Sequence, residues 1–212
     1  MDRRFGLIIT ALVIGFAGIF WFNSRSKQSN GSTDTKATVT SHVQGAGTKG
    51  VTLIEYGDFE CPACGQYFPI LKEIKSRFGD DIAFQFRHFP LPSHPQARAA
   101  HRAAEAAGRQ GKFFEMHDML YTRQDAWSGN TAAARIFEGY AQELSLDMDK
   151  FRADVASESV NATINADITA GQAAGATGTP TFVLNGKTIP NPRGLDEFVK
   201  VIEDAINQKS VQ

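Results

Sequence analysis

The chain has 212 residues, of which 42% are hydrophobic, and its formal net charge is -1. This apolar content is enough for one ordinary globular core, so the chain is not a disordered segment. The balanced charge offers no basic excess to neutralise phosphates, which argues against nucleic acid as a partner. Two cysteines are too few for a scaffold of several disulfides or for a four-cysteine zinc or iron–sulfur site.

The first segment, residues 1–22, is predicted to be a membrane anchor. Residues 5–22 are uncharged and would span roughly 27 Å as a helix, close to the thickness of the hydrocarbon core of a bilayer. The stretch ends in the bulky residues 19–22, whereas a signal peptide is cut after small residues, so we expect an uncleaved transmembrane helix. Basic residues flank both ends, so charge leaves the orientation open, although the α-amino group favours a cytoplasmic N-terminus.

Residues 23–49 are predicted to be a flexible polar linker, because Ser, Thr, Gly, Asn, Lys and Gln predominate there. The remaining residues, 50–212, are expected to fold as one domain. Its first elements are a β-rich run at residues 51–56, helical spacing of apolar side chains at residues 62–78, and alternation at residues 82–89. Strand, helix and strand in this order predict a βαβ unit.

A helical insertion is predicted at about residues 93–176, where Ala, Glu, Arg, Met and Gln are frequent. The Gly and Asn residues within it fit three or four helices. Residues 181–184 and 187–189 are then predicted to be strands joined by an Asn-Gly turn. Residues 195–207 are predicted to be a closing amphipathic helix.

The motif Cys61-Pro62-Ala63-Cys64 begins the first predicted helix. Proline is favoured at the first helical position, so Cys61 is expected to be the N-cap, with its sulfur accepting from the amides of the first turn. The helix dipole also stabilises a thiolate there, whereas Cys64 lies one turn further on the apolar stripe. We therefore predict that Cys61 attacks and Cys64 resolves, with Pro62 and Ala63 modulating the pKa.

Two features are expected to keep the lowering of the Cys61 pKa moderate. Asp58 and Glu60 bring negative charge close, and the two residues between the cysteines offer no cation. Other interpretations of the spacing are an inert cysteine pair or half of a metal site, for instance with His88 and His94, although the interval from the cysteines exceeds that of common zinc fingers. The redox interpretation is preferred, with no metal and no cofactor besides the cysteine pair.

Three stretches resemble the DsbA-like branch of the thioredoxin superfamily, especially its membrane-tethered bacterial members. They are EYGDFECPAC at residues 55–64, QGKFFEMHD at residues 110–118 and GTPTF at residues 178–182, and the resemblance spans about residues 48–208. It implies an α/β thioredoxin fold with a sheet of four to five strands. The helical insertion would lie between the βαβ half and the ββα half, after one N-terminal transmembrane helix.

The resemblance also implies that Pro180 is cis and faces the active-site disulfide. From the residues alone, Pro180 need only be a proline at the start of a strand. A cis bond would leave the backbone of Thr179 free to pair with an extended substrate, so Thr179 and Pro180 are candidates for substrate contact. Glu55 matches an acid thought to assist proton transfer at the buried cysteine. Its other interpretation is an edge-strand glutamate that reaches water, and Arg87 is a guess for its cationic partner.

Several further side chains are expected to be structural. The alanines of one helical stripe should form a close packing face rather than a cofactor groove, and Trp127 should anchor the core rather than contact substrate. The histidines of the insertion are expected to have surface or capping roles. The alanines are Ala97, Ala100, Ala104 and Ala107, and the histidines are His94, His101 and His117.

These features predict a thiol-disulfide oxidoreductase, and specifically an oxidase that donates the Cys61–Cys64 disulfide to reduced, extended secreted or cell-envelope proteins. The alternatives are a disulfide isomerase or reductase, and a tethered peptide-binding chaperone module. The resemblance implies reoxidation by a membrane partner of the DsbB or vitamin K epoxide reductase type. We expect a monomer with a single membrane pass and an extracytoplasmic catalytic domain, because cytosolic thiols would keep the pair reduced.

Overall fold

The computed structural model describes residues 38–40 and 42–210, and one compact unit contains all of them. The predicted anchor at residues 1–22 and the first part of the predicted linker lie outside the described residues. Within the described part of the chain, no helix has the length and apolar character needed to cross a membrane. The anchor therefore stays a prediction.

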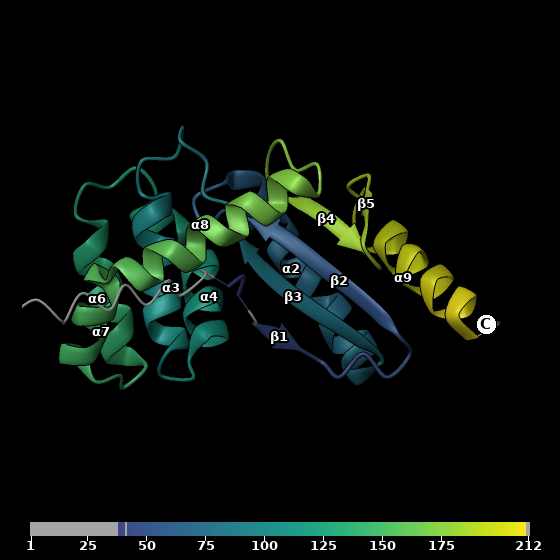
Figure 1. Cartoon of the computed structure of the whole chain (residues 1–212), viewed down its shortest axis with the longest axis horizontal. Coiled ribbons are helices and arrows are strands. Elements are labelled where there is room, and N and C mark those ends of the chain that lie inside the picture. The colour runs from purple at the N-terminus through teal and green to yellow at the C-terminus, as the bar shows by residue number, and fades with distance from the viewer. Residues whose placement is uncertain (1–37, 41, 211–212) are drawn as a thin grey trace, which may run out of the picture. The chain divides into compact units, whose positions relative to one another are not determined.

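A five-stranded mixed sheet with the order β1-β3-β2-β4-β5 forms the centre of this unit (Figure 1). The central strand β2 (Val51–Gly57) pairs in parallel with β3 (Ile82–His88) and antiparallel with β4 (Thr181–Leu184). The edge strands are β5 (Lys187–Ile189), beside β4, and β1 (Val43–Gln44), beside β3. This is the predicted thioredoxin-like α/β sheet.

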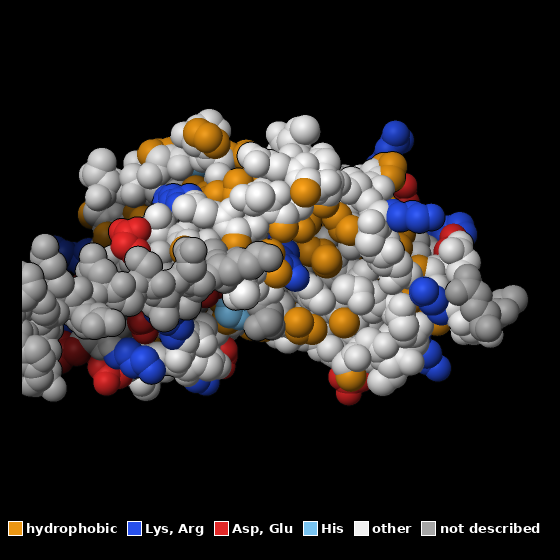
Figure 2. Space-filling view, in the orientation of Figure 1, with side chains coloured by type: hydrophobic (Ala, Val, Ile, Leu, Met, Phe, Trp, Pro, Cys, Tyr) orange, Lys and Arg blue, Asp and Glu red, His pale blue; other side chains and the backbone are white. Residues whose placement is uncertain are grey.

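Helices cover both faces of the sheet. Helix α2 (Pro62–Phe78), which begins with the cysteine motif, lies behind the strands in Figure 1, and α9 (Leu195–Ser210) packs against α2 and β2. On the front face, α8 (Glu158–Ala173) crosses β3 (Figure 1). Hydrophobic side chains remain visible over the strands beside α8 (Figure 2), so the helices do not cover this face completely.

The first βαβ unit follows its predicted bounds, because local signals mark both ends of α2. Pro62 stands in the first turn, where its missing amide hydrogen removes no helical hydrogen bond. Gly79 ends the helix with a positive φ of 49°, and a 3-10 turn (Gly79–Asp81) leads into β3. The buried face of α2 consists of Cys64, Phe68, Leu71 and Ile74.

The helical insertion contains six helices in the described chain, more than the three or four predicted. One of them, α5, is a single turn, and α7 and α8 meet at Ser157 without any Gly or Asn to mark the break. Ser157 is the N-cap of α8, and its side chain accepts from the Val160 amide. The helices are α3 (Ala97–Gly108), α4 (Phe113–Thr122), α5 (Gln124–Trp127), α6 (Ala133–Glu143), α7 (Met148–Ala156) and α8.

Helix α3 is the centre of the insertion and contacts α4, α6, α7 and α8. The small alanine side chains of its predicted stripe are all fully buried, which lets the neighbouring helices approach closely. Trp127 is also fully buried, and its indole nitrogen donates to the Leu120 carbonyl at 2.9 Å. The predictions of a packing face and of a core anchor are confirmed.

The predicted domain boundary at residue 50 lies too late in the chain. Before it, β1 pairs with β3, and the ring of His42 stacks on Phe113 with centroids 3.5 Å apart. Thr40 donates to the Asp167 carboxylate from its amide at 2.9 Å and from its hydroxyl at 2.8 Å. Polar contacts hold this segment on the domain, so its polar composition does not indicate a linker there.

Candidate active site

The two cysteines lie at the start of α2. Cys61 is the N-cap and Cys64 lies one turn further, fully buried in the core, as predicted. Cys61 is only 6% exposed, so a small part of this thiol is accessible, whereas Cys64 is fully enclosed. Both are free thiols, so the structure describes the reduced pair.

The environments of the two thiols drive their pKa values in opposite directions. A hydrogen bond from the Cys64 thiol is the largest of the effects that lower the pKa of Cys61 to about 5, against the opposing effect of burial. Thr179 and the amides of Ala63 and Cys64 lower it further. Burial, followed by the hydrogen bond with Cys61, raises the pKa of Cys64 well above its usual value. Cys61 is the thiol suited to be a nucleophile at neutral pH.

The amides at the N-terminus of α2 also act on the Cys61 thiol. The side chain of Cys61 accepts no capping hydrogen bond, so the predicted bonds from the amides of the first turn to its sulfur do not form. The amides of Ala63 and Cys64 nevertheless contribute to lowering the pKa of the Cys61 thiol.

Asp58 does not moderate the Cys61 pKa as predicted. Its carboxylate accepts from the amides of Glu60 and Leu91, both at 2.8 Å, and contacts His94 Nδ1 at 2.7 Å. Burial raises the pKa of Asp58, but the neighbouring histidines and the Leu91 amide outweigh burial, so the pKa is lowered. The negative charge of Asp58 is thus engaged by its own partners, and the lowering of the Cys61 pKa is large.

Glu60 is likewise engaged away from the sulfur. Its side chain is 3% exposed and accepts from the Gln96 amide at 2.5 Å and from the Gly129 amide at 2.7 Å. Glu60 therefore joins the active-site loop to the segment before α3 and to the loop after α5. The prediction treated this residue as a free charge, which the structure corrects.

Residues 179 and 180 lie opposite the cysteines. The Thr179–Pro180 bond is cis, as the resemblance implied. The sulfur of Cys61 lies 3.4 Å from the Thr179 carbonyl oxygen, and Asn191 donates to the Pro180 carbonyl at 2.9 Å. The buried hydroxyl of Thr179 has no hydrogen-bond partner among the described residues. The substrate-binding roles of Thr179 and Pro180 stay predictions.

Glu55 lies on the central strand β2 and is 1% exposed, so it is not an edge-strand glutamate that reaches water. Neither of its carboxyl oxygens has a partner within the described chain. Burial, opposed by the charge of Lys75, raises the pKa of Glu55 to about 8, and Glu55 in turn contributes to the raised pKa of Cys64. Its cationic neighbour is Lys75 of α2, whereas Arg87 pairs with Asp167 at 3.4 Å.

Sequence reasoning missed the role of Gln124 and the burial of two histidines. Gln124 of α5 donates to the carbonyls of Phe59 and Cys61 at 2.7 and 3.0 Å, and no local sequence signal marks it. His101 and His117 are buried at 0% and 2% exposure, which corrects the expectation of surface or capping roles. A histidine on an otherwise apolar face of a predicted helix is the signal that could have placed them inside.

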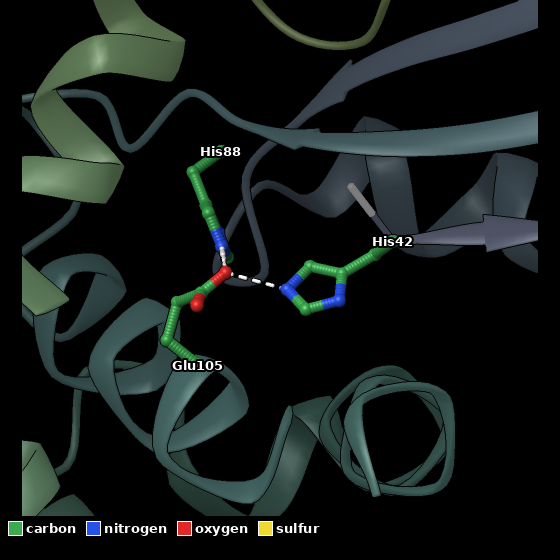
Figure 3. A group of neighbouring side chains, drawn as sticks. All are labelled: His42, His88 and Glu105. Atoms are coloured by element: carbon green, nitrogen blue, oxygen red, sulfur yellow. Dashed lines mark hydrogen bonds and ion pairs between the residues drawn. The ribbon is translucent and has the colours of Figure 1, made fainter. Parts of the chain in front are cut away.

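The group most similar to a metal site consists of His42, His88 and Glu105 (Figure 3). Glu105 Oε1 lies 2.6 Å from His42 Nε2 and 2.7 Å from His88 Nε2. These separations are typical of charge-assisted hydrogen bonds, whereas two ligand atoms on a tetrahedral zinc ion lie about 3.3 Å apart. The distances favour a hydrogen-bonded cluster, and His88 and His94 are engaged away from the cysteines.

Comparison with known proteins gives the family. The family model described as Thioredoxin matches residues 37–204. Na(+)/H(+) antiporter NhaA 1 of Salinispora arenicola is 44% identical over 147 residues, which are 69% of this chain and 22% of that protein. NhaA 3 of Salinispora tropica is 38% identical over 165 residues, or 77% and 24% of the two chains. The chain thus spans about a quarter of the length of these curated relatives.

Solved structures share the fold. BdbD from Bacillus subtilis has a TM-score of 0.69 at 23% identity and covers 78% of this chain and 92% of its own. DsbA2 from Pseudomonas aeruginosa has a TM-score of 0.61 at 27% identity, with 76% and 91% covered. Alpha-DsbA1 from Wolbachia pipientis has a TM-score of 0.70 at 19% identity, with 84% and 98% covered. The chain belongs to the thioredoxin family, and its fold is shared with the DsbA-type proteins among these structures.

Proposed function

We propose that this protein is an oxidase that donates the Cys61–Cys64 disulfide to reduced proteins of the cell envelope or to secreted proteins. The observation that carries the proposal is the opposite shift of the two thiols, with the pKa of Cys61 lowered to about 5 and that of Cys64 raised. A stabilised Cys61 thiolate favours the reduced form of the pair, which makes the disulfide a better oxidant.

The exchange proceeds in two steps. A client thiolate attacks Cys61 of the disulfide, a mixed disulfide forms, and Cys64 leaves as a thiolate that takes up a proton. A second client thiolate attacks the client sulfur of the mixed disulfide, which closes the client disulfide and releases Cys61 as a thiolate. Because the pKa of Glu55 is about 8 and its charge acts on Cys64, Glu55 is suited to deliver that proton in the buried site.

The client is an extended peptide that lies beside Cys61 and contacts Thr179 and Pro180. The closeness of the Thr179 carbonyl to the Cys61 sulfur supports this placement, because a strand added there would carry its cysteine to the nucleophile. A hollow of 460 Å³ is lined by apolar residues including Phe89, Leu91 and Pro92 and by His94, which contacts Asp58 of the loop before Cys61. It is suited to the apolar side chains of an unfolded client.

The remaining parts of the proposal concern location and reoxidation. Residues 1–22 would anchor the chain in the cell membrane, with the catalytic domain on the extracytoplasmic side and a membrane reoxidant of the DsbB or vitamin K epoxide reductase type. The uncharged stretch at residues 5–22 and the match to proteins named Na(+)/H(+) antiporters support a site of action at a membrane. An isomerase or reductase would use the same cysteines at a lower potential.

Two variants test the reaction. Cys61→Ser should abolish oxidation of a reduced client peptide. Given a client peptide that already carries a disulfide, Cys64→Ser should trap a mixed disulfide, because the Cys61 thiolate attacks one client sulfur, the other client sulfur leaves as a thiolate, and the resolving thiol is missing. Mass spectrometry of the trapped species identifies the attacking cysteine. In the reduced wild type, Cys61 should be alkylated much faster than the fully enclosed Cys64. If Cys61→Ser still oxidises the client, the proposal that Cys61 carries out the exchange is contradicted, and a peptide-binding module is favoured.

The reduction potential decides the direction of the reaction. We expect a value of roughly -100 to -200 mV, and we expect the reduced protein to unfold at a higher temperature than the oxidised one, because the Cys61 thiolate stabilises the reduced state. Ala63→His should shift the couple further towards oxidising values by placing a cation beside Cys61. A potential near or below the roughly -270 mV of thioredoxin, with a more stable oxidised form, would contradict the oxidase.

A further inference from the structure

A chain of buried hydrogen bonds connects the active-site loop to the N-terminal segment. His88 Nε2 lies 2.7 Å from Glu105 Oε1, and His88 Nδ1 lies 2.6 Å from His101 Nδ1. The other nitrogen of His101, Nε2, faces the amide of Phe59 at 3.4 Å. At the far end Glu105 also contacts His42 (Figure 3). Phe59 lies two residues before Cys61, so the chain ends at the loop that carries the nucleophile.

The positions of the hydrogens follow from counting donors and acceptors. A carboxylate only accepts, and it lies between two imidazole nitrogens, so His88 Nε2 must carry the hydrogen that Glu105 accepts. The neutral form of His88 then has a bare Nδ1, which accepts from His101 Nδ1. This leaves His101 Nε2 bare, and that atom faces a backbone amide that has a hydrogen to donate.

The other arrangement of hydrogens is less favourable. A hydrogen on His101 Nε2 would face the Phe59 amide with a second donor and leave that buried amide unpaired, and the acceptor nearest to it, Asp58 Oδ1, would be 3.9 Å away. Burial also lowers the pKa of His101 to about 4, so its ring is neutral and carries one hydrogen. Glu105 thus determines, through His88, which nitrogen of His101 accepts.

We propose that His101 is a positioning residue for the thiol-disulfide exchange, because its bare Nε2 holds the Phe59 amide and thereby the loop in front of Cys61. This inference rests on the proposed function. The held loop also supplies the Asp58 amide, which donates to the Cys64 sulfur at 3.5 Å, and the Asp58 carbonyl, which accepts from the Cys61 amide at 3.1 Å. The link from His101 therefore reaches both cysteines through backbone groups.

The groups that face His101 come from several elements. Asp58 Oδ1 lies 3.9 Å from His101 Nε2, beyond hydrogen-bond distance, and the rings of Phe59 and Phe86 pack against the imidazole. These rings would also hold a residue that is merely part of the core. A positioning role differs from a structural one because it depends on the acceptor at Nε2 and not on the volume of the ring.

The first experiment reads the tautomers directly in the reduced wild-type protein. A long-range ¹H–¹⁵N spectrum should show His101 with hydrogen on Nδ1 and a bare Nε2, and His88 with hydrogen on Nε2 and a bare Nδ1. A hydrogen on His101 Nε2, or a doubly protonated His101 at neutral pH, overturns the proposal. This measurement needs no variant, so it decides the question even where a substitution prevents folding.

The second experiment separates the effect of the acceptor at His101 Nε2 from the effect of the volume of the ring. His101→Gln places an amide oxygen near the position of Nε2, whereas His101→Phe keeps a ring and removes the acceptor. We expect His101→Phe to loosen the loop and to raise the Cys61 pKa, measured from thiolate absorbance. At a pH below the pKa of Cys61, the variant should contain about tenfold less thiolate than the wild type. His101→Gln should retain most of the wild-type titration. Equal titrations in His101→Phe and the wild type, or equal losses in both variants, overturn the proposal.

His117→Phe is the matched control. His117 is a second buried histidine in the same aromatic cluster, but its hydrogen bond goes to Asp118 and not to the loop. If His117→Phe raises the Cys61 pKa as far as His101→Phe does, the effect is general loosening of the core and the proposal fails. A smaller shift in His117→Phe supports the specific role of His101.

Measurements of the reduction potential and of client oxidation distinguish a failure of the His101 proposal from a failure of the proposed function. A tenfold loss of thiolate stabilisation corresponds to about 30 mV, so His101→Phe should be more reducing than the wild type by about that amount. If the wild type fails to oxidise a reduced client peptide, the proposed function fails, whereas the titration still tests His101. If the wild type oxidises the client and the His101 variants share its titration and potential, only the role of His101 fails.

Discussion

Two buried carboxyl groups three residues apart behave in opposite ways. Asp58, on the loop side of the active-site helix, accepts from two amides and contacts His94, and its pKa is lowered. Glu55, on the sheet beneath the helix, has no partner in the described chain, and its pKa is raised to about 8. Their exposures are 0% and 1%, so partners rather than depth of burial decide the charge at each site.

The same contrast holds for the two regions around these carboxyl groups. On the loop side, Glu60, His101 and Gln124 all have hydrogen-bond partners and fix the backbone before Cys61. Beneath the helix, Glu55 is unpaired next to Cys64, where proton transfer requires a group that gains and loses its charge. The hydrogen-bonded side chains of the loop side hold the backbone before Cys61 in place, whereas the unpaired Glu55 can gain and lose a proton next to Cys64.

The largest expected effect comes from removing the partners on the loop side. Asp58→Leu keeps the branching of the side chain but is larger, and it leaves the amides of Glu60 and Leu91 and the His94 ring without an acceptor. We expect the free energy of unfolding to fall by about 3–5 kcal/mol, measured by urea denaturation. Asp125→Leu, at an exposed aspartate, is the control and should change it by less than about 0.5 kcal/mol. Equal losses in the two variants would show that the Asp58 contacts contribute little.

The second effect is the pH dependence of stability that the unpaired Glu55 should cause. The pKa of Glu55 rises from 4.5 to about 8 on folding, so its contribution to stability is fully present below pH 4.5 and is lost as the pH rises towards 8. Between about pH 6 and pH 8 the wild type should therefore lose about 2 kcal/mol relative to Glu55→Gln, which cannot ionise. Parallel stability curves for the two proteins would show that Glu55 is already ionised at pH 6.

A smaller effect is expected at Gln124, which bridges the loop from the insertion. Gln124→Met keeps the length of the side chain and removes the two hydrogen bonds to the carbonyls of Phe59 and Cys61. The free energy of unfolding should fall by about 1–2 kcal/mol. Gln142→Met, at an exposed position of α6, supplies the comparison and should be close to neutral. If Gln124→Met is also neutral, the bridge does not stabilise the folded state.

The smallest effect concerns the N-terminal segment around Thr40, which is hydrogen-bonded to Asp167 of α8. Thr40→Val keeps the shape of the side chain and removes the hydroxyl that donates to Asp167 at 2.8 Å. A loss of about 1 kcal/mol is expected in the free energy of unfolding, and hydrogen exchange at Val43 and Gln44 should become faster. Thr122→Val, at an exposed position, should change neither measurement. Unchanged exchange in Thr40→Val would mean that the segment is held by its other contacts.

Local patterns predicted the elements that surround the cysteines. The proline after Cys61, the glycine after Phe78 and the alternation at residues 82–88 are signals within a few residues, and the corresponding helix and strands follow them closely. The insertion was predicted less well, because the break at Ser157 carries no glycine and α5 is only one turn. The N-terminal segment was missed because its polar residues bind carboxylates and rings far away in the sequence.

The sequence by itself predicted the candidate reactive pair and determined the helix on which it lies and the strands that flank it, because spacing and helix capping act between neighbouring residues. Only the tertiary structure decided that Lys75 rather than Arg87 lies near Glu55, that Asp58 and Glu60 are engaged away from Cys61, and that His101 faces the loop. The physical reason is that pKa values and hydrogen bonds in the core depend on which distant side chains share a low-dielectric environment, and their order in the chain does not encode that arrangement locally.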